Sequence, residues 1–164
     1  MAVSNGGQNS KLAAFRRLLR DQPEPLLILL AFVFHFTWEM LQDPLYAGLS
    51  ERPHGEVRSL CLMASLGDIV IVLIAFYAAA LAAGSRFWFI NVKLAPFAVW
   101  VASGLLITVG LELIATRTTG RWNYSPLMPV IPLIRVGVAP LGQWLVIPTI
   151  LYALMNAHFR SEHN

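Results

Sequence analysis

The sequence predicts an all-α fold: a polytopic membrane protein with four transmembrane helices in one bundle. The chain has 164 residues, of which 57% are hydrophobic and 13% are charged. A soluble domain averages about 45–50% apolar and about 25% charged residues, so this composition is typical of a membrane protein. A spanning helix needs roughly 20 mainly apolar residues, and the chain contains four runs of about that length.

The four apolar runs are residues 25–41, 60–83, 94–115 and 138–155. We interpret the first run as a retained helix rather than a cleaved signal peptide, because no small-residue cleavage site follows it at residues 37–39. Three prolines between the third and fourth runs, Pro126, Pro129 and Pro132, are expected to keep that loop non-helical.

The apolar runs divide the chain into three parts. Residues 1–24 form a basic cytoplasmic tail, residues 25–157 form the four-helix transmembrane domain, and residues 158–164 form a C-terminal tail. The tail contains a short basic amphipathic stretch at residues 11–20. We expect it to lie on the membrane surface, attracted by anionic lipid, or to act only as positive charge flanking the first span.

The orientation follows from the positions of the basic residues, since four spans place both chain ends on one side. With the ends in the cytoplasm, seven of the 12 Lys and Arg residues lie inside: Lys11, Arg16, Arg17, Arg20, Arg86, Lys93 and Arg160. This bias predicts a multi-pass protein of a bacterial inner (cytoplasmic) membrane with both termini cytoplasmic. Loops 42–59 and 116–137 would then lie outside.

The same composition excludes several classes of protein. The net charge is +3, but the basic residues lie in loops and tails, so we exclude nucleic acid as a partner. Cys61 is the only cysteine, which rules out an internal disulfide. Paired Cys and His residues at zinc-ligand spacing are absent from the sequence, and we assign no metal and no cofactor.

One acidic or amide residue interrupts each apolar run. These residues are Glu39, Asp68, Glu112 and Gln143. A carboxylate in hydrocarbon costs several kcal/mol unless it is paired or protonated, so such residues usually mark a site. Tracing the four alternating spans places all of them in the same half of the membrane, the outer half in the predicted orientation.

Helical spacing extends this polar region along two faces. On the first span, His35, Glu39, Gln42 and Asp43 follow one stripe. On the third span, four small or polar residues recur every fourth position: Gly104, Thr108, Glu112 and Thr116. Small residues let helices approach closely, so these stripes are expected to face the bundle interior.

These residue types indicate acid chemistry in an apolar pocket. Asp68, the deepest carboxyl group, is the candidate general acid, and Glu39 and Glu112 are candidates for stabilising a carbocation, held ionised by Arg121. The candidate substrate-binding residues are His35, Gln42, Asp43, Arg121, Trp122, Tyr124 and Gln143. Two alternatives stay open: the polar groups only fasten helices together, or the oxygen-rich cluster binds a divalent cation.

Residues 120–144, GRWNYSPLMPVIPLIRVGVAPLGQW, resemble a segment of the small bacterial and fungal membrane lycopene (carotenoid) cyclases. The matching positions are Gly120, Trp122, Tyr124, Pro126, Pro140, Leu141 and Trp144. The resemblance implies acid chemistry on a polyene, but Gly142 and Gln143 replace the acidic pair of that family. Residues 34–46 and 65–71 also resemble segments of small bacterial four-helix membrane proteins of unassigned function.

The sequence therefore predicts an integral membrane protein with an acidic pocket in the outer leaflet. The pocket would bind or modify a membrane lipid or an isoprenoid-like apolar ligand by acid chemistry. A small proton- or cation-coupled transporter and an accessory membrane subunit are the alternatives. Whether the protein is an enzyme, and whether it forms a homo-oligomer, stay open.

Overall fold

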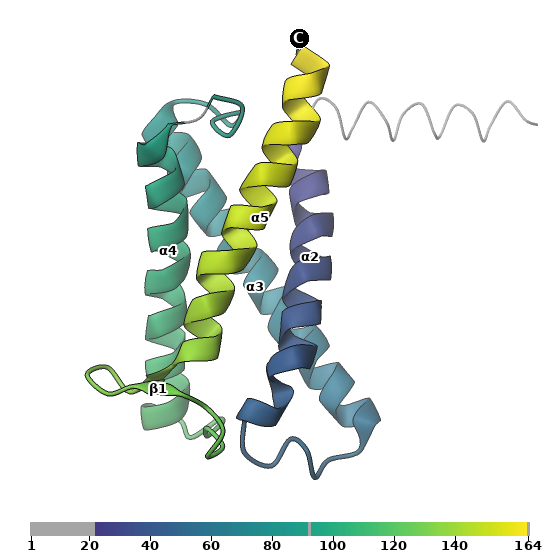
Figure 1. The fold of residues 1–164 in the computed structure, drawn as a ribbon, viewed down its shortest axis with the longest axis vertical. Coiled ribbons are helices and arrows are strands. Elements are labelled where there is room, and N and C mark those ends of the chain that lie inside the picture. The colour runs from purple at the N-terminus through teal and green to yellow at the C-terminus, as the bar shows by residue number, and fades with distance from the viewer. Residues whose placement is uncertain (1–21, 92, 164) are drawn as a thin grey trace, which may run out of the picture.

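The protein is a bundle of four long helices that run alternately up and down (Figure 1). The computed structural model describes residues 22–91 and 93–163, and the predicted amphipathic stretch at residues 11–20 lies outside them. The helices are α2 (Pro23–Gln42), α3 (His54–Ala83), α4 (Leu94–Leu113) and α5 (Val138–His163). Each is long and apolar enough to cross a membrane, which confirms the predicted all-α, multi-pass architecture.

Short elements close the bundle at the end that carries the loops after α2 and α4 (Figure 1). A 3-10 turn, η1 (Asp43–Leu45), follows α2, and a π-helical turn, η2 (Ile114–Thr118), continues α4. Strands β1 (Val130–Ile131) and β2 (Val136–Gly137) pair antiparallel. An isolated antiparallel bridge between Tyr46 and Tyr124 joins the two loops.

Three helix boundaries differ from the predicted ones. Helix α3 begins at His54, six residues before the apolar run, because nothing between Pro53 and Leu60 breaks the helix and Glu56 complements the dipole of its first turn. Helix α4 passes directly into η2, so the backbone stays coiled beyond position 115. Helix α5 continues to His163, through most of the segment that the sequence assigns to a tail.

The helices are arranged around a square. Helix α2 packs against α3 and α5, and α4 also packs against α3 and α5, so α3 and α5 lie on a diagonal. Many large apolar side chains on the outside are exposed, such as Leu29, Val33, Leu81 and Leu106. Such a surface is expected where helices face lipid rather than water.

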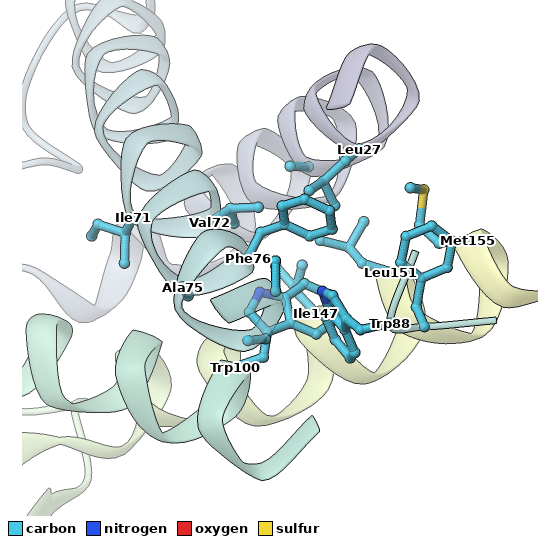
Figure 2. Close-up of a cluster of buried hydrophobic side chains, with 14 of the residues drawn as sticks. Leu27, Ile71, Val72, Ala75, Phe76, Trp88, Trp100, Ile147, Leu151 and Met155 are labelled. Atoms are coloured by element: carbon cyan, nitrogen blue, oxygen red, sulfur yellow. The ribbon is translucent and has the colours of Figure 1, made fainter. Parts of the chain in front are cut away.

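An aromatic and aliphatic core fills the bundle on the side where α2 begins and α5 ends (Figure 2). Its largest buried members include Phe76 on α3, Trp100 on α4 and Leu151 on α5, and Trp88 enters from the loop after α3. The space enclosed by Leu27, Phe76, Trp88, Phe89, Trp100, Tyr152 and Met155 does not admit a water molecule. These side chains therefore pack without a water-filled cavity between them.

The closest packing between helices joins α4 to α5 at Gly104. A Cβ atom at Gly104 would overlap the indole ring of Trp144, which is itself fully buried. Thr108 and Glu112 lie one and two turns further along α4 and are also buried. The predicted small and polar stripe on this helix thus faces the interior, because glycine leaves room there for a large aromatic side chain.

A polar contact fastens α2 to α3 at the end of the bundle away from the loops described above. The Glu24 Oε1 atom accepts hydrogen bonds from Arg86 Nη1 at 3.0 Å and from the Tyr77 hydroxyl at 3.2 Å. The Arg86 side chain is 49% exposed, so the ion pair contributes only about 0–1 kcal/mol to stability. The hydrophobic core separates this ion pair from Glu39, Asp68 and Glu112.

Candidate functional site

The Gln143 side-chain amide joins three helices at the centre of the bundle. Its Nε2 atom lies 2.9 Å from His35 Nδ1, 3.2 Å from Glu39 Oε1 and 3.0 Å from Asp68 Oδ2. His35 and Glu39 come from α2, Asp68 from α3 and Gln143 from α5. Three of the four polar residues that interrupt the apolar runs therefore meet at one point, as the sequence predicts, together with His35.

His35 and Asp68 lie next to each other at this centre. The His35 Nδ1 atom is 3.3 Å from Asp68 Oδ2, and both atoms also lie within 3.0 Å of the Gln143 amide nitrogen. That nitrogen carries two hydrogens but has three neighbours that can accept one. The imidazole and the carboxyl group, two groups that can each donate or accept a hydrogen bond, are therefore in direct contact in the interior of the bundle.

The two members of this pair differ in accessibility. The His35 side chain is fully buried, whereas the Asp68 side chain is 14% exposed. The His35 Nε2 atom has no hydrogen-bond partner among the described residues, and its ring lies 5.2 Å from that of Trp144. A ligand can therefore reach the pair only through Asp68.

Glu39 is positioned by side chains of its own helix. Gln42 Nε2 donates to Glu39 Oε1 at 2.8 Å, and the Trp38 indole N–H donates to Gln42 Oε1 at 3.1 Å. Gln143 provides the second donor to the same Glu39 oxygen. The chain from Trp38 through Gln42 thus fixes the Glu39 carboxylate beside Gln143.

Glu112 is the centre of a second cluster formed with the two loops. The Tyr124 hydroxyl and the Trp122 indole N–H donate to Glu112 Oε2, the latter at 3.4 Å. The Tyr46 hydroxyl donates to Glu112 Oε1 at 3.3 Å. Three neutral donors therefore hold a buried carboxyl group at the end of α4, which reduces the cost of removing it from water.

The two tyrosines remain protonated donors. Burial raises the pKa of Tyr46 above that of a free phenol, and the negative charges of Glu112 and then Glu39 raise it further. Burial likewise raises the pKa of Tyr124, as does its hydrogen bond to Glu112. Of these two carboxyl groups, Glu112 is the one to which the Tyr46 hydroxyl donates a hydrogen bond.

The predicted pairing of the acids with arginine is wrong. The Arg121 guanidinium lies 5.6 Å from the ring centre of Trp122, and Arg117 Nη2 donates to the Ile134 carbonyl at 2.5 Å. Within residues 22–91 and 93–163, no Lys or Arg forms an ion pair with Glu39, Asp68 or Glu112. Phenol and indole donors contact the Glu112 carboxyl group in place of an arginine.

Two predicted site residues take no part in these networks. Arg121 is exposed, and Asp43 lies in η1, where its side chain has no hydrogen bond to the described residues. Conversely, Trp38 and Tyr46 belong to the networks although the sequence indicates only aromatic residues at a membrane boundary. The four-residue spacing of Trp38 and Gln42 is the signal that could have identified the first.

The clusters are not arranged as a metal site. Among the described residues, no three His, Cys, Asp or Glu side chains lie close enough together to hold one metal ion. The Gln143 amide nitrogen, a hydrogen-bond donor, occupies the point that His35, Glu39 and Asp68 share. The geometry favours hydrogen bonding at this point.

A pocket of about 470 Å³ opens beside the Glu112 cluster, where η2 and the loop after it meet. Its lining residues are Thr116, Arg117, Asn123, Tyr124, Leu133 and Arg135. Tyr124 contributes to both features, since its hydroxyl bonds Glu112 while the residue lines the pocket. This volume falls in the range of about 300–1,000 Å³ that small-molecule sites occupy.

We expect Tyr124→Phe to lower the free energy of unfolding by about 1–3 kcal/mol, because it removes one of the three donors to Glu112 and also the acceptor of the Gly137 N–H. Tyr46→Phe is the matched variant and removes only one long hydrogen bond, so its loss should stay below about 1 kcal/mol. Titration with sodium dodecyl sulfate in mixed micelles, followed by circular dichroism, measures both. Equal losses would contradict the assigned geometry.

Comparisons of the chain with protein-family models, with curated proteins and with solved structures give no match. The resemblance of residues 120–144 to the membrane lycopene cyclases therefore stays a prediction from the sequence. The function has to be argued from the two clusters and the pocket.

Proposed function

We propose that this integral membrane protein binds an isoprenoid or another lipid near one membrane face and donates a proton to it from Asp68. The observation that carries the proposal is the 3.3 Å contact between Asp68 Oδ2 and His35 Nδ1, in a pair of which only Asp68 is partly exposed. A carboxylic acid that is kept near apolar surroundings is suited to protonating a carbon–carbon double bond.

The surrounding residues fit the charge that such a step develops. Transfer of the Asp68 proton to an alkene carbon leaves a carbocation on the lipid and a carboxylate on Asp68. The carboxyl groups of Glu39 and Glu112 and the electron-rich rings of Trp122 and Tyr124 would stabilise this cation. Loss of a neighbouring carbon-bound proton to a carboxylate then gives an isomerised or cyclised lipid, with no oxidation or reduction.

The resemblance to the lycopene cyclases supports the same chemistry. Gln143 replaces the second acid of the pair in that family, and its amide contacts the carboxyl groups of Glu39 and Asp68. The acids would thus be supplied by α2 and α3 instead of by α5. We infer that the polar centre serves the same acid chemistry as in the cyclases, with carboxyl groups that come from different helices.

The test compares Asp68→Asn with the wild type in lycopene-producing cells grown in partly deuterated water. The asparagine keeps size and hydrogen bonding but lacks the acidic proton, so the variant should fold while losing any protein-dependent deuterium in the isoprenoids. Glu56→Gln changes an exposed acid of the same helix and is the control. Identical isoprenoid mass spectra from wild-type and Asp68→Asn cells would contradict the proposal.

A proton- or cation-coupled transporter and an accessory subunit are the alternative functions. Transport requires a path from the Gln143 cluster to the opposite end of the bundle, where Glu24 lies. The core between them, which includes Phe76 and Trp100, leaves no space for a water molecule. This packing supports a site that opens on one side over a path through the membrane.

We further propose that the protein lies in a bacterial inner membrane with both termini in the cytoplasm. The excess of basic residues in the N-terminal part supports this orientation. In a Cys61→Ser background, Gly55→Cys and Leu127→Cys should react with an impermeant thiol reagent on intact cells, and Ser161→Cys only after permeabilisation. The reverse pattern would invert the orientation while leaving the bundle unchanged.

A further inference from the structure

The pocket beside the Glu112 cluster carries two arginines that the acid chemistry does not use. Arg117 and Arg135 both line it, and no acidic residue does. Arg117 is held in place because its Nη2 atom donates to the Ile134 carbonyl at 2.5 Å, which leaves its other N–H groups available. The pocket is therefore a cationic depression with one guanidinium already oriented.

Arg135 reaches this pocket from a strained backbone. Its φ angle is 51°, the only positive value of a non-glycine residue among the described ones. A non-glycine residue in this left-handed region costs on the order of 1 kcal/mol, and glycine would adopt it at little cost. The Arg135 side chain is exposed and has no hydrogen-bond or ion-pair partner among the described residues. The positive φ belongs to the turn between β1 and β2, which the Arg135 N–H closes by donating to the Ile131 carbonyl at 2.7 Å. This turn holds the unpaired guanidinium beside the pocket.

The pocket also lies next to the end of a candidate membrane span. It directly follows the span that ends at Thr118, and Leu133 in its wall is 91% exposed. Two cations and exposed aliphatic side chains at the end of a spanning helix match the phosphate layer of a bilayer and the acyl chains below it. The chemistry that fits is a phosphate group attached to an apolar chain.

We propose that Arg117 and Arg135 bind the phosphate group of a phosphate-bearing lipid in this pocket, with Asn123 as a further donor. Arginine is the side chain best suited to this, since its planar guanidinium bonds phosphate oxygens in pairs. The inference rests on the proposed lipid function and adds its substrate class: the phosphate would anchor the lipid at the pocket. Tyr124 lines the pocket and also bonds Glu112, so the apolar chain of the lipid would extend from the pocket past Tyr124 toward the acidic residues.

The experiment measures binding of farnesyl phosphate and of farnesol to the full chain in dodecylmaltoside micelles by isothermal titration calorimetry. Wild type should bind farnesyl phosphate at least 10-fold more tightly than farnesol. Arg135→Gly should fold at least as stably as wild type, because it relieves the strained backbone, yet bind farnesyl phosphate at least 10-fold more weakly. Arg117→Gln should show the same loss of affinity.

Two controls decide whether the site or the overall charge is responsible. Arg58→Gln removes an exposed cation from the N-terminal part of α3, outside the pocket, and should change the affinity less than twofold. Equal losses in Arg58→Gln and Arg135→Gly would overturn the proposal, as would equal binding of farnesol and farnesyl phosphate by wild type. The deuterium experiment on Asp68→Asn measures the acid chemistry separately from this binding experiment, so failure of the acid chemistry and failure of this pocket are distinguishable.

Two competitors identify the source of the phosphate. Displacement of farnesyl phosphate by dioleoylphosphatidylglycerol, but not by dioleoylphosphatidylcholine, would support an anionic lipid as the ligand. Inorganic phosphate should compete at least 100-fold less well than farnesyl phosphate, since it lacks the apolar chain. Competition by inorganic phosphate at equal concentration would show that the pocket takes free phosphate and would overturn the lipid assignment.

Discussion

Gly104→Ala is expected to destabilise the bundle by about 1–3 kcal/mol, although alanine is the better helix former. The added Cβ atom overlaps the indole ring of Trp144, which is fully buried between helices and has no free space to enter. Either the indole leaves its rotamer or α4 and α5 separate. Both responses loosen the contact that holds Gln143, the neighbour of Trp144, in the polar centre.

Gly110→Ala is the matched control for this prediction. It lies on the same helix, but a Cβ atom there meets nothing within 4 Å. The control should leave the free energy of unfolding unchanged or raise it by up to about 1 kcal/mol. Detergent unfolding followed by circular dichroism measures both variants. Similar stabilities for the two alanine variants would show that α4 and α5 are not packed as closely as described.

Gln143→Leu is expected to lower the free energy of unfolding by about 2–4 kcal/mol and to abolish any activity of the site. The variant keeps the approximate volume of the side chain but removes the N–H donors that lie 3.0 Å from Asp68 and 3.2 Å from Glu39. Two carboxyl groups in the bundle interior then lose a partner that no nearby cation replaces. The loss of stability arises because the two carboxyl groups no longer have a donor that replaces the hydrogen bonds water makes to them in the unfolded chain.

Thr149→Val tests whether any polar residue of α5 would give the same result. Thr149 is exposed on the same helix, and its hydroxyl bonds only the Leu145 carbonyl of the preceding turn. Its replacement should change stability by less than about 0.5 kcal/mol. The comparison again uses detergent unfolding. A Gln143→Leu protein as stable as Thr149→Val would mean that Gln143 does not join the three helices.

The stability and the chemistry of the polar centre are linked through the same contacts. Gln143 holds Asp68 and Glu39 on different helices, and Asp68 Oδ2 in turn lies 3.3 Å from His35 Nδ1. A substitution that frees one of these groups therefore shifts the others. For this reason Asp68→Asn, which keeps the hydrogen bonds, separates chemistry from stability better than a change at Gln143.

The sequence by itself determined the four spanning helices and the helices from which the polar centre is built. Hydrophobic runs of spanning length specify a membrane bundle, because unpaired backbone groups cannot face lipid. Alternating direction then fixes that Glu39, Asp68, Glu112 and Gln143 lie in one half of it. These features depend on composition and helical periodicity, which are properties of local sequence.

Only the tertiary structure decided which polar groups touch. Glu112 separates from the other three residues and bonds Tyr46 and Tyr124, because the loops after α2 and α4 fold together in a bridge that no periodicity encodes. Arg121, which was expected to keep the acids ionised, instead lies over the ring of Trp122. A charged side chain on a loop can adopt many conformations before the protein folds, and packing of the loop selects one of them. Partner choice in this bundle is therefore a property of the folded loops, whereas the position of each buried acid is a property of its helix.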